Sequence, residues 1–480
     1  MVIRGLKIRG SVVRFRPWPP SFHADSFSSQ NAVGYLKNSS FILAISSVAA
    51  LGGLLFGFDT AVISGAIPSL QALFSLDEYA LGWAVGSILI GCALGAVVAG
   101  KLADQFGRRL TLLACAILFG VSGVGAGLAN TLHSFVFFRL VGGIGVGAAA
   151  IVSPLYISET APAAWRGRLV SLYQLAIVFG ILLAYFCNYA FANIANGWRW
   201  MFAAQTLPAL IFGMCLLAVP ETPRWLVGRK RMSSARTILE KTLGTDAARA
   251  ELALIERSFN ASTGSSLREV FDRNHRPVLV MGILIAVFQQ VTGINAILYY
   301  APTIFAKTGL DTASSLLQTL ALGGVNLVAT FGAIALVDKL GRRSLLLSGS
   351  AVMGAALAAV ALCFHYGYFE GYIVLALMLL YVAVFACTLG AVTWVYLAEI
   401  FPNSIRATAM SVATLALWLA GFLVAYTFPM MNEHLSTAAT LACYAVFCAL
   451  ALVYVRAKVP ETKGRRLEEL EALFVKEGSA

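Results

Sequence analysis

Long apolar runs alternate with short charged segments along almost the whole chain. Twelve of these runs have about 20 residues or more, the length that an α-helix needs to cross a bilayer. They lie at residues 43–67, 80–102, 110–129, 132–157, 169–192, 200–219, 278–306, 314–337, 344–364, 372–398, 407–428 and 435–456. The pattern predicts an all-α membrane protein with twelve transmembrane helices rather than a series of soluble domains.

The charged motifs between the runs occur twice. Asp104 with Arg108 and Arg109 is matched by Asp338 with Arg342 and Arg343, 234 residues later. Further matches follow at an offset of 240, where Glu159 and Arg166 correspond to Glu399 and Arg406, and Pro220-Glu221-Thr222 corresponds to Pro460-Glu461-Thr462. Repeats spaced by about half the chain predict two pseudo-symmetric six-helix bundles, an organisation found in secondary transporters.

These repeats divide the chain into five predicted segments. The two bundles are expected at residues 41–220 and 278–456, with a cytoplasmic helical linker at 221–277, where residues 233–243 and 247–259 have helical spacing. Residues 457–480 are expected to form a cytoplasmic tail. Residues 1–40 hold six basic residues and one acidic residue without an apolar signal segment, so we expect a disordered cytoplasmic extension, with an organelle transit peptide as the alternative.

The distribution of the basic residues indicates how the chain is oriented in the membrane. Only 12% of the residues are charged, yet the net charge is +12. Of the 35 Lys and Arg residues, only Arg139, Arg199 and Lys307 lie inside the spans or in the loops of the opposite side, apart from Lys101 and Arg456 at the cytoplasmic ends of their spans. The positive-inside bias therefore predicts a multi-pass protein of a plasma or bacterial inner membrane with both termini in the cytoplasm. We expect contact with anionic membrane lipid and no binding of nucleic acid.

The sequence shows no arrangement of residues that is typical of an enzyme active site or of a metal site. All eight cysteines fall in apolar spans without metal-like pairing, so we interpret them as small packing residues. His275 stands alone in the linker, with no nucleophile or acid–base pair around it. We expect no metal, no cofactor and no catalytic residue.

Two charged residues lie well inside the spans. Asp59 is in the first span and Arg139 in the fourth, and each costs a few kcal/mol to place in a bilayer unless it faces water or a partner. Both are therefore functional candidates, the alternative being a purely structural hydrogen bond or ion pair. The glycines at 142, 143, 145 and 147 behind Arg139 indicate close helix packing rather than a dinucleotide motif, because no strand precedes them.

The repeated charges are predicted to lie at cytoplasmic helix ends. Ion pairs there can close the cytoplasmic side in one conformation and part in the other, although they could also serve only to fix topology. The candidate gate residues are Asp104, Arg108, Arg109, Glu159, Arg166, Asp338, Arg342, Arg343, Glu399 and Arg406.

Neutral polar and aromatic side chains gather in the second half. The seventh span carries Gln289, Gln290, Asn295 and Tyr299, with Gly293 as a point where the helix can bend. Asn326, Trp394 and Trp418 complete the candidate binding set. Amides beside aromatic faces suit an uncharged, hydroxyl-rich ligand, whereas a single amide would more simply join two helices.

These motifs resemble the sugar porter family of the major facilitator superfamily over about residues 40–470. The stretches at residues 220–225 and 460–464 are specific to that family, and the type of loop at 100–109 marks the superfamily. The resemblance implies two six-helix bundles that open alternately around a central monosaccharide. It implies sugar contacts at Gln174, Gln289, Gln290, Asn295, Asn326 and Trp394. It also implies a proton-carrying Asp at Asp59 with an Arg at Arg139, where facilitative members have a neutral residue in place of the Asp.

The chain departs from a proton-coupled member of that family at four positions. Gln205 stands where that pattern has Glu, Ile181 and Leu417 where it has Gln, and Gly421 where it has Asn. The first change removes an acidic partner from the proton site. The others make the pocket less polar, so the sugar of that member does not carry over to this chain.

The sequence thus predicts a secondary active transporter that imports a hexose or pentose, such as glucose, galactose or xylose, by proton symport with alternating access. The expected partners are the monosaccharide, protons and membrane lipid, and the fold is expected to function as a monomer. The alternatives are an uncoupled sugar uniporter and, from another class, a membrane sugar sensor.

Overall fold

The computed structural model describes residues 39–162, 165–261, 267–273, 275–369, 371–402 and 404–464. Twelve spans within them are long and apolar enough to cross a membrane, which confirms the predicted number. Nearly all of the predicted extension at residues 1–40 and most of the predicted tail lie outside the described residues. The helix ends fall within a few residues of the predicted ends, except that the first span continues to Phe74 and the eleventh to His434.

The first half of the chain forms six spans. They are α2 (Ser39–Ala61) with α3 (Ile63–Phe74), α4 (Glu78–Phe106), α5 (Arg108–Leu128), α6 (Leu132–Thr160), α7 (Arg166–Phe191), and α8 (Gly197–Ala203) with α9 (Thr206–Ala218). The second half repeats them. Its spans are α14 (Arg276–Val291) with α15 (Ile294–Ala306), α16 (Thr312–Leu340), α17 (Arg342–Tyr366), α18 (Ile373–Phe385) with the π-helix η2 (Ala386–Gly390) and α19 (Ala391–Ile400), α20 (Arg406–His434) and α21 (Thr437–Lys458).

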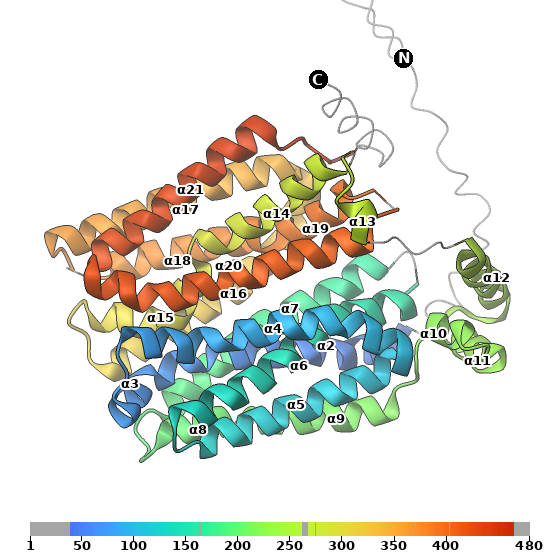
Figure 1. Cartoon of the computed structure of the whole chain (residues 1–480), viewed down its shortest axis with the longest axis horizontal. Coiled ribbons are helices and arrows are strands. Elements are labelled where there is room, and N and C mark those ends of the chain that lie inside the picture. The colour runs from blue at the N-terminus through green and yellow to red at the C-terminus, as the bar shows by residue number, and fades with distance from the viewer. Residues whose placement is uncertain are drawn as a thin grey trace, which may run out of the picture.

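The two halves lie side by side as two bundles (Figure 1). The helices α10 (Pro223–Gly228), α11 (Met232–Leu243) and α12 (Thr245–Ala261) cover one end of the first bundle, which we call the linker end. The opposite end, where α3, α8 and α15 lie, is called the far end. Both expected linker helices are present as α11 and α12. The short helices α10 and α13 (Leu267–Val270) were not predicted, because six and four residues are too few for a hydrophobic period to show.

Contacts between the halves run along α4 against α20 and along α7 against α16. Near the far end, Glu78 Oε1 lies 3.5 Å from His434 Nε2. Further along, the rings of Trp83 and Phe422 meet edge to face at 5.8 Å between centroids. At Gly82 an added Cβ would lie 2.2 Å from the carbonyl oxygen of Tyr426, so the two backbones touch there. The halves are therefore packed together in the part of the bundle toward the far end.

The seventh span is broken, as the sequence predicted at Gly293. The helix ends at Val291 and restarts at Ile294, and Gly293 has φ +96°, a conformation that a residue with a Cβ rarely adopts. The ring of Tyr444 fills the space in which a Cβ would stand, 2.7 Å away. The break therefore separates α15 from α14 at the depth of the candidate binding residues.

Glycines bring α4 and α6 into backbone contact, which confirms the packing interpretation of the run behind Arg139. A Cβ at Gly147 would lie 2.0 Å from the carbonyl oxygen of Cys92, and one at Gly143 would lie 2.1 Å from that of Ile88. The reverse contact is made by Gly95, at 2.2 Å from the carbonyl oxygen of Ile144. These obstacles are backbone atoms, so they cannot be relieved by a change of side-chain rotamer.

We expect Gly147→Ala to lower the free energy of unfolding by about 1–3 kcal/mol, since overpacking forces α4 and α6 apart. Gly100→Ala on the partner helix α4 is the control, because Gly100 is exposed and has nothing within 4 Å of the added Cβ. Thermal unfolding of the purified protein in detergent measures both. Equal melting temperatures for the two variants would contradict the packing assignment.

Candidate functional site

Asp59 on α2 and Arg139 on α6 form a closed ion pair between two helices of the first half. One terminal nitrogen of the guanidinium (NH1) lies 2.5 Å from Asp59 Oδ1 and also donates to the Asp59 carbonyl oxygen at 2.8 Å. Both residues are completely buried. The structure thus brings together the two charges that the sequence placed in separate spans.

The pair leaves several polar atoms without a hydrogen-bond partner. They are Asp59 Oδ2, Arg139 Nε and the second terminal nitrogen of that guanidinium. The ring of Phe202 covers the guanidinium, with the ring centroid 5.5 Å from its central carbon. An added Cβ at Gly142 would lie 2.6 Å from Asp59 Oδ2, so this oxygen lies close against the backbone of α6.

Gln205 lies beside this pair. Its side chain is fully buried, its Nε2 donates to the carbonyl oxygen of Phe119 at 3.2 Å, and its Oε1 has no partner. An amide cannot carry charge, so Asp59 is the one carboxylate among the described residues of this site. Asp59 Oδ2 and Gln205 Oε1 are both acceptors without a donor. A proton on the Asp59 carboxyl group would supply the missing donor.

Three of the predicted binding residues form a chain of amides at the break in the seventh span. Asn295 Nδ2 donates to Gln290 Oε1 at 2.7 Å, and Gln290 Nε2 donates to Gln289 Oε1 at 3.0 Å. Gln289 Nε2 donates in turn to the carbonyl oxygen of Leu389 in η2, at 3.4 Å. The amides lie on both sides of the break, so a ligand that binds them bridges α14 and α15.

The other predicted binding residues lie on five helices, with Gln174 on α7, Tyr299 on α15, Asn326 on α16, Trp394 on α19 and Trp418 on α20. Tyr299, Asn326 and Trp418 are buried, whereas Gln174 and Trp394 are partly exposed. No hydrogen bond among the described residues joins Gln174, Asn326 or Trp394 to the three amides. The indole Nε1 of Trp418 is buried without a partner, and its ring lies 5.6 Å from that of Phe56, between centroids.

Gly421 on α20 faces the amides. A Cβ there would lie 3.0 Å from Gln290 Oε1 and 3.2 Å from Asn295 Nδ2. Glycine at this position therefore brings α20 close to the amide chain and adds no polar group of its own. This geometry agrees with the expectation of a pocket with fewer polar contacts.

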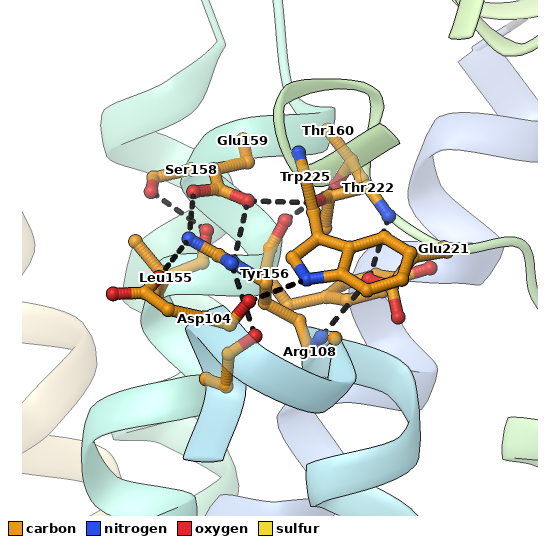
Figure 2. A network of polar contacts seen from close by, with 12 residues as sticks. Asp104, Arg108, Leu155, Tyr156, Ser158, Glu159, Thr160, Glu221, Thr222 and Trp225 are labelled. Carbon is orange, nitrogen blue, oxygen red and sulfur yellow. Dashed lines mark hydrogen bonds and ion pairs between the residues drawn. The ribbon is translucent and has the colours of Figure 1, made fainter. Parts of the chain in front are cut away.

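At the linker end, Arg108 is the centre of a charged network (Figure 2). Its guanidinium lies 3.0 Å from Asp104 Oδ1 and 3.1 Å from Glu159 Oε2. The second half repeats the arrangement, with Arg342 2.9 Å from Glu399 Oε1. Each of these ion pairs joins helices within one half.

Two carboxylates that the prediction did not assign to the gate complete these networks. Glu221 accepts from the backbone N–H groups of Arg108 and Arg109, each at 3.0 Å, and so caps the start of α5. Glu461 accepts from Arg342 N at 2.9 Å and Arg343 N at 3.1 Å and caps α17. The signal for both was the repeated Pro-Glu-Thr sequence, which was noted as a repeat but given no role.

The threonines of the same repeat bind the acidic gate residues. Thr222 Oγ1 donates to Glu159 Oε2 at 2.6 Å, and Thr462 Oγ1 donates to Glu399 Oε2 at 2.5 Å. The glycines that precede α5 and α17 make room for the caps, since each has a positive φ and a Cβ would meet the carboxylate. They are Gly107, with φ +101°, and Gly341, with φ +85°.

Three other predicted gate arginines donate hydrogen bonds to backbone carbonyl oxygens. Arg109 donates to the carbonyl oxygens of Leu216 and Leu217, Arg343 donates to that of Arg456, and Arg406 donates to that of Phe401. Arg166 is exposed and lines a cavity of about 670 Å³ between the gate and α10 and α12. The side chain of Asp338 lies outside the described residues.

The two capping carboxylates differ in their pKa. Burial raises the pKa of Glu221 and outweighs the backbone N–H groups of Thr222, Arg109 and Arg108, which lower it. Burial also acts to raise the pKa of Glu461. However, the backbone N–H groups of Lys463 and three other residues together lower its pKa. The charged form is thus disfavoured at Glu221 and favoured at Glu461.

Two six-helix halves around buried polar residues at midspan have the architecture of a secondary transporter. Comparisons with known proteins narrow this class. A family model described as sugar (and other) transporter matches residues 45–474. The chain is 43% identical to the D-xylose-proton symporter of Escherichia coli (strain K12), covering 91% of this chain and 96% of that protein. It is 40% identical to the arabinose-proton symporter of Bacillus subtilis (strain 168), with the same two coverages.

A solved structure agrees with these relatives. The inward open conformation of the xylose transporter from E. coli superposes with a TM-score of 0.80 at 41% identity, covering 90% of this chain and 99% of that one. The chain therefore belongs to the sugar transporter family, and it is an integral membrane protein.

We expect Glu461→Gln to lower the free energy of unfolding by about 0.5–2 kcal/mol at pH 7.5, the range for losing a helix cap. Glu221→Gln should cost less, because burial already disfavours the charge of Glu221. A lowered pKa contributes stability above the unfolded-state value and loses it on acidification. The difference between Glu461→Gln and the wild type should therefore shrink as the pH falls through about 4. Melting temperatures measured from pH 7.5 to pH 4 test this, and a larger loss in Glu221→Gln would contradict it.

Proposed function

We propose that this protein is a secondary active transporter that imports a monosaccharide by proton symport with alternating access. The observation that carries the proposal is the fully buried Asp59–Arg139 pair, which lies in the same membrane interior as the amide chain of Gln289, Gln290 and Asn295. An uncoupled carrier of a neutral sugar needs no buried carboxylate, whose insertion costs a few kcal/mol. The relatives named as pentose–proton symporters support the same conclusion.

Asp59 is the proposed proton carrier and Arg139 its modulator. While Asp59 is charged, the guanidinium holds it between α2 and α6. A proton on the free oxygen Oδ2 cancels that attraction and leaves α2 free to shift against α6. When the guanidinium approaches again, it favours the carboxylate and expels the proton. Gln205 supplies an uncharged neighbour, so one carboxylate titrates in this site.

The sugar is proposed to bind at the amide chain, between the aromatic side chains of Trp394 and Trp418. Each sugar hydroxyl both donates and accepts, which matches the two-sided hydrogen bonding of the amides. Gly421 in place of a polar residue favours a hexose or pentose that needs no hydrogen bond from α20. Phe56 lies one helical turn before Asp59 and contacts Trp418, so a shift of α2 on protonation reaches the sugar site directly.

The proposed setting is a plasma or bacterial inner membrane, with the linker end in the cytoplasm and the transporter active as a monomer in contact with anionic lipid. The basic residues concentrate at the linker end, as the positive-inside bias requires. The networks around Arg108 and Arg342 are then proposed to belong to the cytoplasmic gate. In the far-end-closed state each holds helices together within one half, so closure of the gate requires further contacts between the halves.

Sugar-induced proton movement in proteoliposomes tests the proposal. Glucose, galactose, xylose, arabinose, fructose and inositol are added outside without an imposed gradient, and the external pH is recorded. We expect alkalinisation with one or two sugars, and its loss in Asp59→Asn, because the amide takes up no proton. Exchange of labelled sugar across the membrane should persist in this variant.

Asp311→Asn is the matched control, since Asp311 is an exposed cap at the start of α16 and asparagine caps equally well. It should keep the proton signal of the wild type. Labelled sugar that enters wild-type vesicles with no pH change would contradict coupling and leave a uniporter. Sugar binding without any transport would indicate a sensor.

A further inference from the structure

Four helices of the described spans contain an interior proline, and at two of these prolines a tyrosine bonds the carbonyl that the proline frees. Pro302 lies in α15 and Pro429 in α20. Proline has no N–H, so the carbonyl four residues earlier loses its helical donor, at Leu298 and at Ala425 respectively. An unpaired carbonyl inside a bilayer costs several kcal/mol unless another group satisfies it.

A buried tyrosine satisfies each of these carbonyls. Tyr185 Oη donates to the Leu298 carbonyl oxygen at 2.8 Å, and Tyr300 Oη donates to that of Ala425 at 2.9 Å. Both tyrosines are 1% exposed. Each hydrogen bond therefore replaces the one that proline removed.

The two bonds differ in what they connect. Tyr300 and Ala425 both belong to the second half, on α15 and α20. Tyr185 belongs to α7 of the first half and reaches across to α15 of the second. Its ring also packs against α16, since a Cβ at Gly323 would lie 2.9 Å from Tyr185 Cδ2. Tyr185 is thus inserted between two helices of the opposite half.

We propose that Tyr185 is a positioning residue that holds α15 against the first half in the far-end-closed state. Opening of the far end separates α7 from α15 and removes the hydroxyl from Leu298. The Leu298 carbonyl then has no helical N–H as an alternative donor, because residue 302 is a proline. The hydrogen bond therefore favours the closed state, and its loss adds to the cost of opening. This role rests on the alternating-access function proposed above.

The position of the bond explains how it would affect transport. α15 carries Asn295 and Tyr299 of the candidate sugar site. Leu298 lies one turn after the first of them and next to the second, so Tyr185 fixes the segment that forms one wall of that site. Release of the carbonyl lets this wall move with the second half when the far end opens.

The chain supplies a matched comparison. Tyr381 Oη on α18 donates to the carbonyl oxygen of Thr292 at the break, at 3.0 Å, and both groups are buried. This bond lies entirely within the second half. Tyr381→Phe and Tyr185→Phe therefore remove the same atom from similar bonds to the same broken span, but only the second variant loses a contact between halves.

Hydrogen–deuterium exchange of the purified protein, without sugar and at one pH, tests the proposal. The readout segments are residues 82–86 of α4 and 422–426 of α20, which cover each other in the closed state. In Tyr185→Phe we expect exchange in both segments to rise by roughly three- to tenfold, the factor expected from one buried hydrogen bond. In Tyr381→Phe these segments should exchange as in the wild type, while the peptide around Thr292 exchanges faster.

Equal exchange of α4 and α20 in Tyr185→Phe and the wild type would overturn the proposal. So would an equal rise in both variants, because that result would mean general loosening. The measurement needs neither transport nor an identified sugar. A failure of the sugar–proton assignment in proteoliposomes would therefore be seen separately from a failure of this one.

Discussion

The structure depends on one pairing of charges in a medium that tolerates neither charge alone. Asp59 and Arg139 are each completely buried, and separation of the two by a few ångströms would leave both unsolvated. The pair therefore fixes α2 against α6, and glycines of α6 let α4 approach α6 from another side. In the proposed mechanism a proton on Asp59 weakens this attraction, although Arg139 keeps its charge, so the interaction that holds the half together is also the one that a proton would release.

The duplicated halves carry the same construction at their linker ends, with a difference that has a physical basis. In each half a carboxylate from the Pro-Glu-Thr repeat caps a helix beside a glycine of positive φ. Burial dominates at Glu221, whereas backbone donors dominate at Glu461. The charged form is thus disfavoured at the first cap and favoured at the second, so we expect the two caps to respond differently to acid.

Sequence patterns predicted what depends on the cost of transfer into a bilayer. The twelve spans, the placement of Asp59 and Arg139 inside them and the bend at Gly293 follow from apolar length, buried charge and backbone freedom. The capping role of Glu221 and the bond from Tyr185 to Leu298 were not predictable in the same way, because their partners are backbone groups. Pro302 does indicate that a carbonyl is free, but no spacing in the chain indicates which distant hydroxyl will reach it.

The proposed coupling between proton and sugar would follow from the positions of these features on neighbouring helices. α2 carries Asp59 and, one turn earlier, Phe56, which touches Trp418 of the proposed sugar site in the other half. Movement of α2 thus reaches α20, and α20 bears Gly421 against the amides of α14 and α15. The halves also meet at Tyr185 on α7, so both contacts converge on the broken seventh span. The proposed coupling needs no long-range relay, because the proposed proton site and the proposed sugar site share neighbouring helices across one interface.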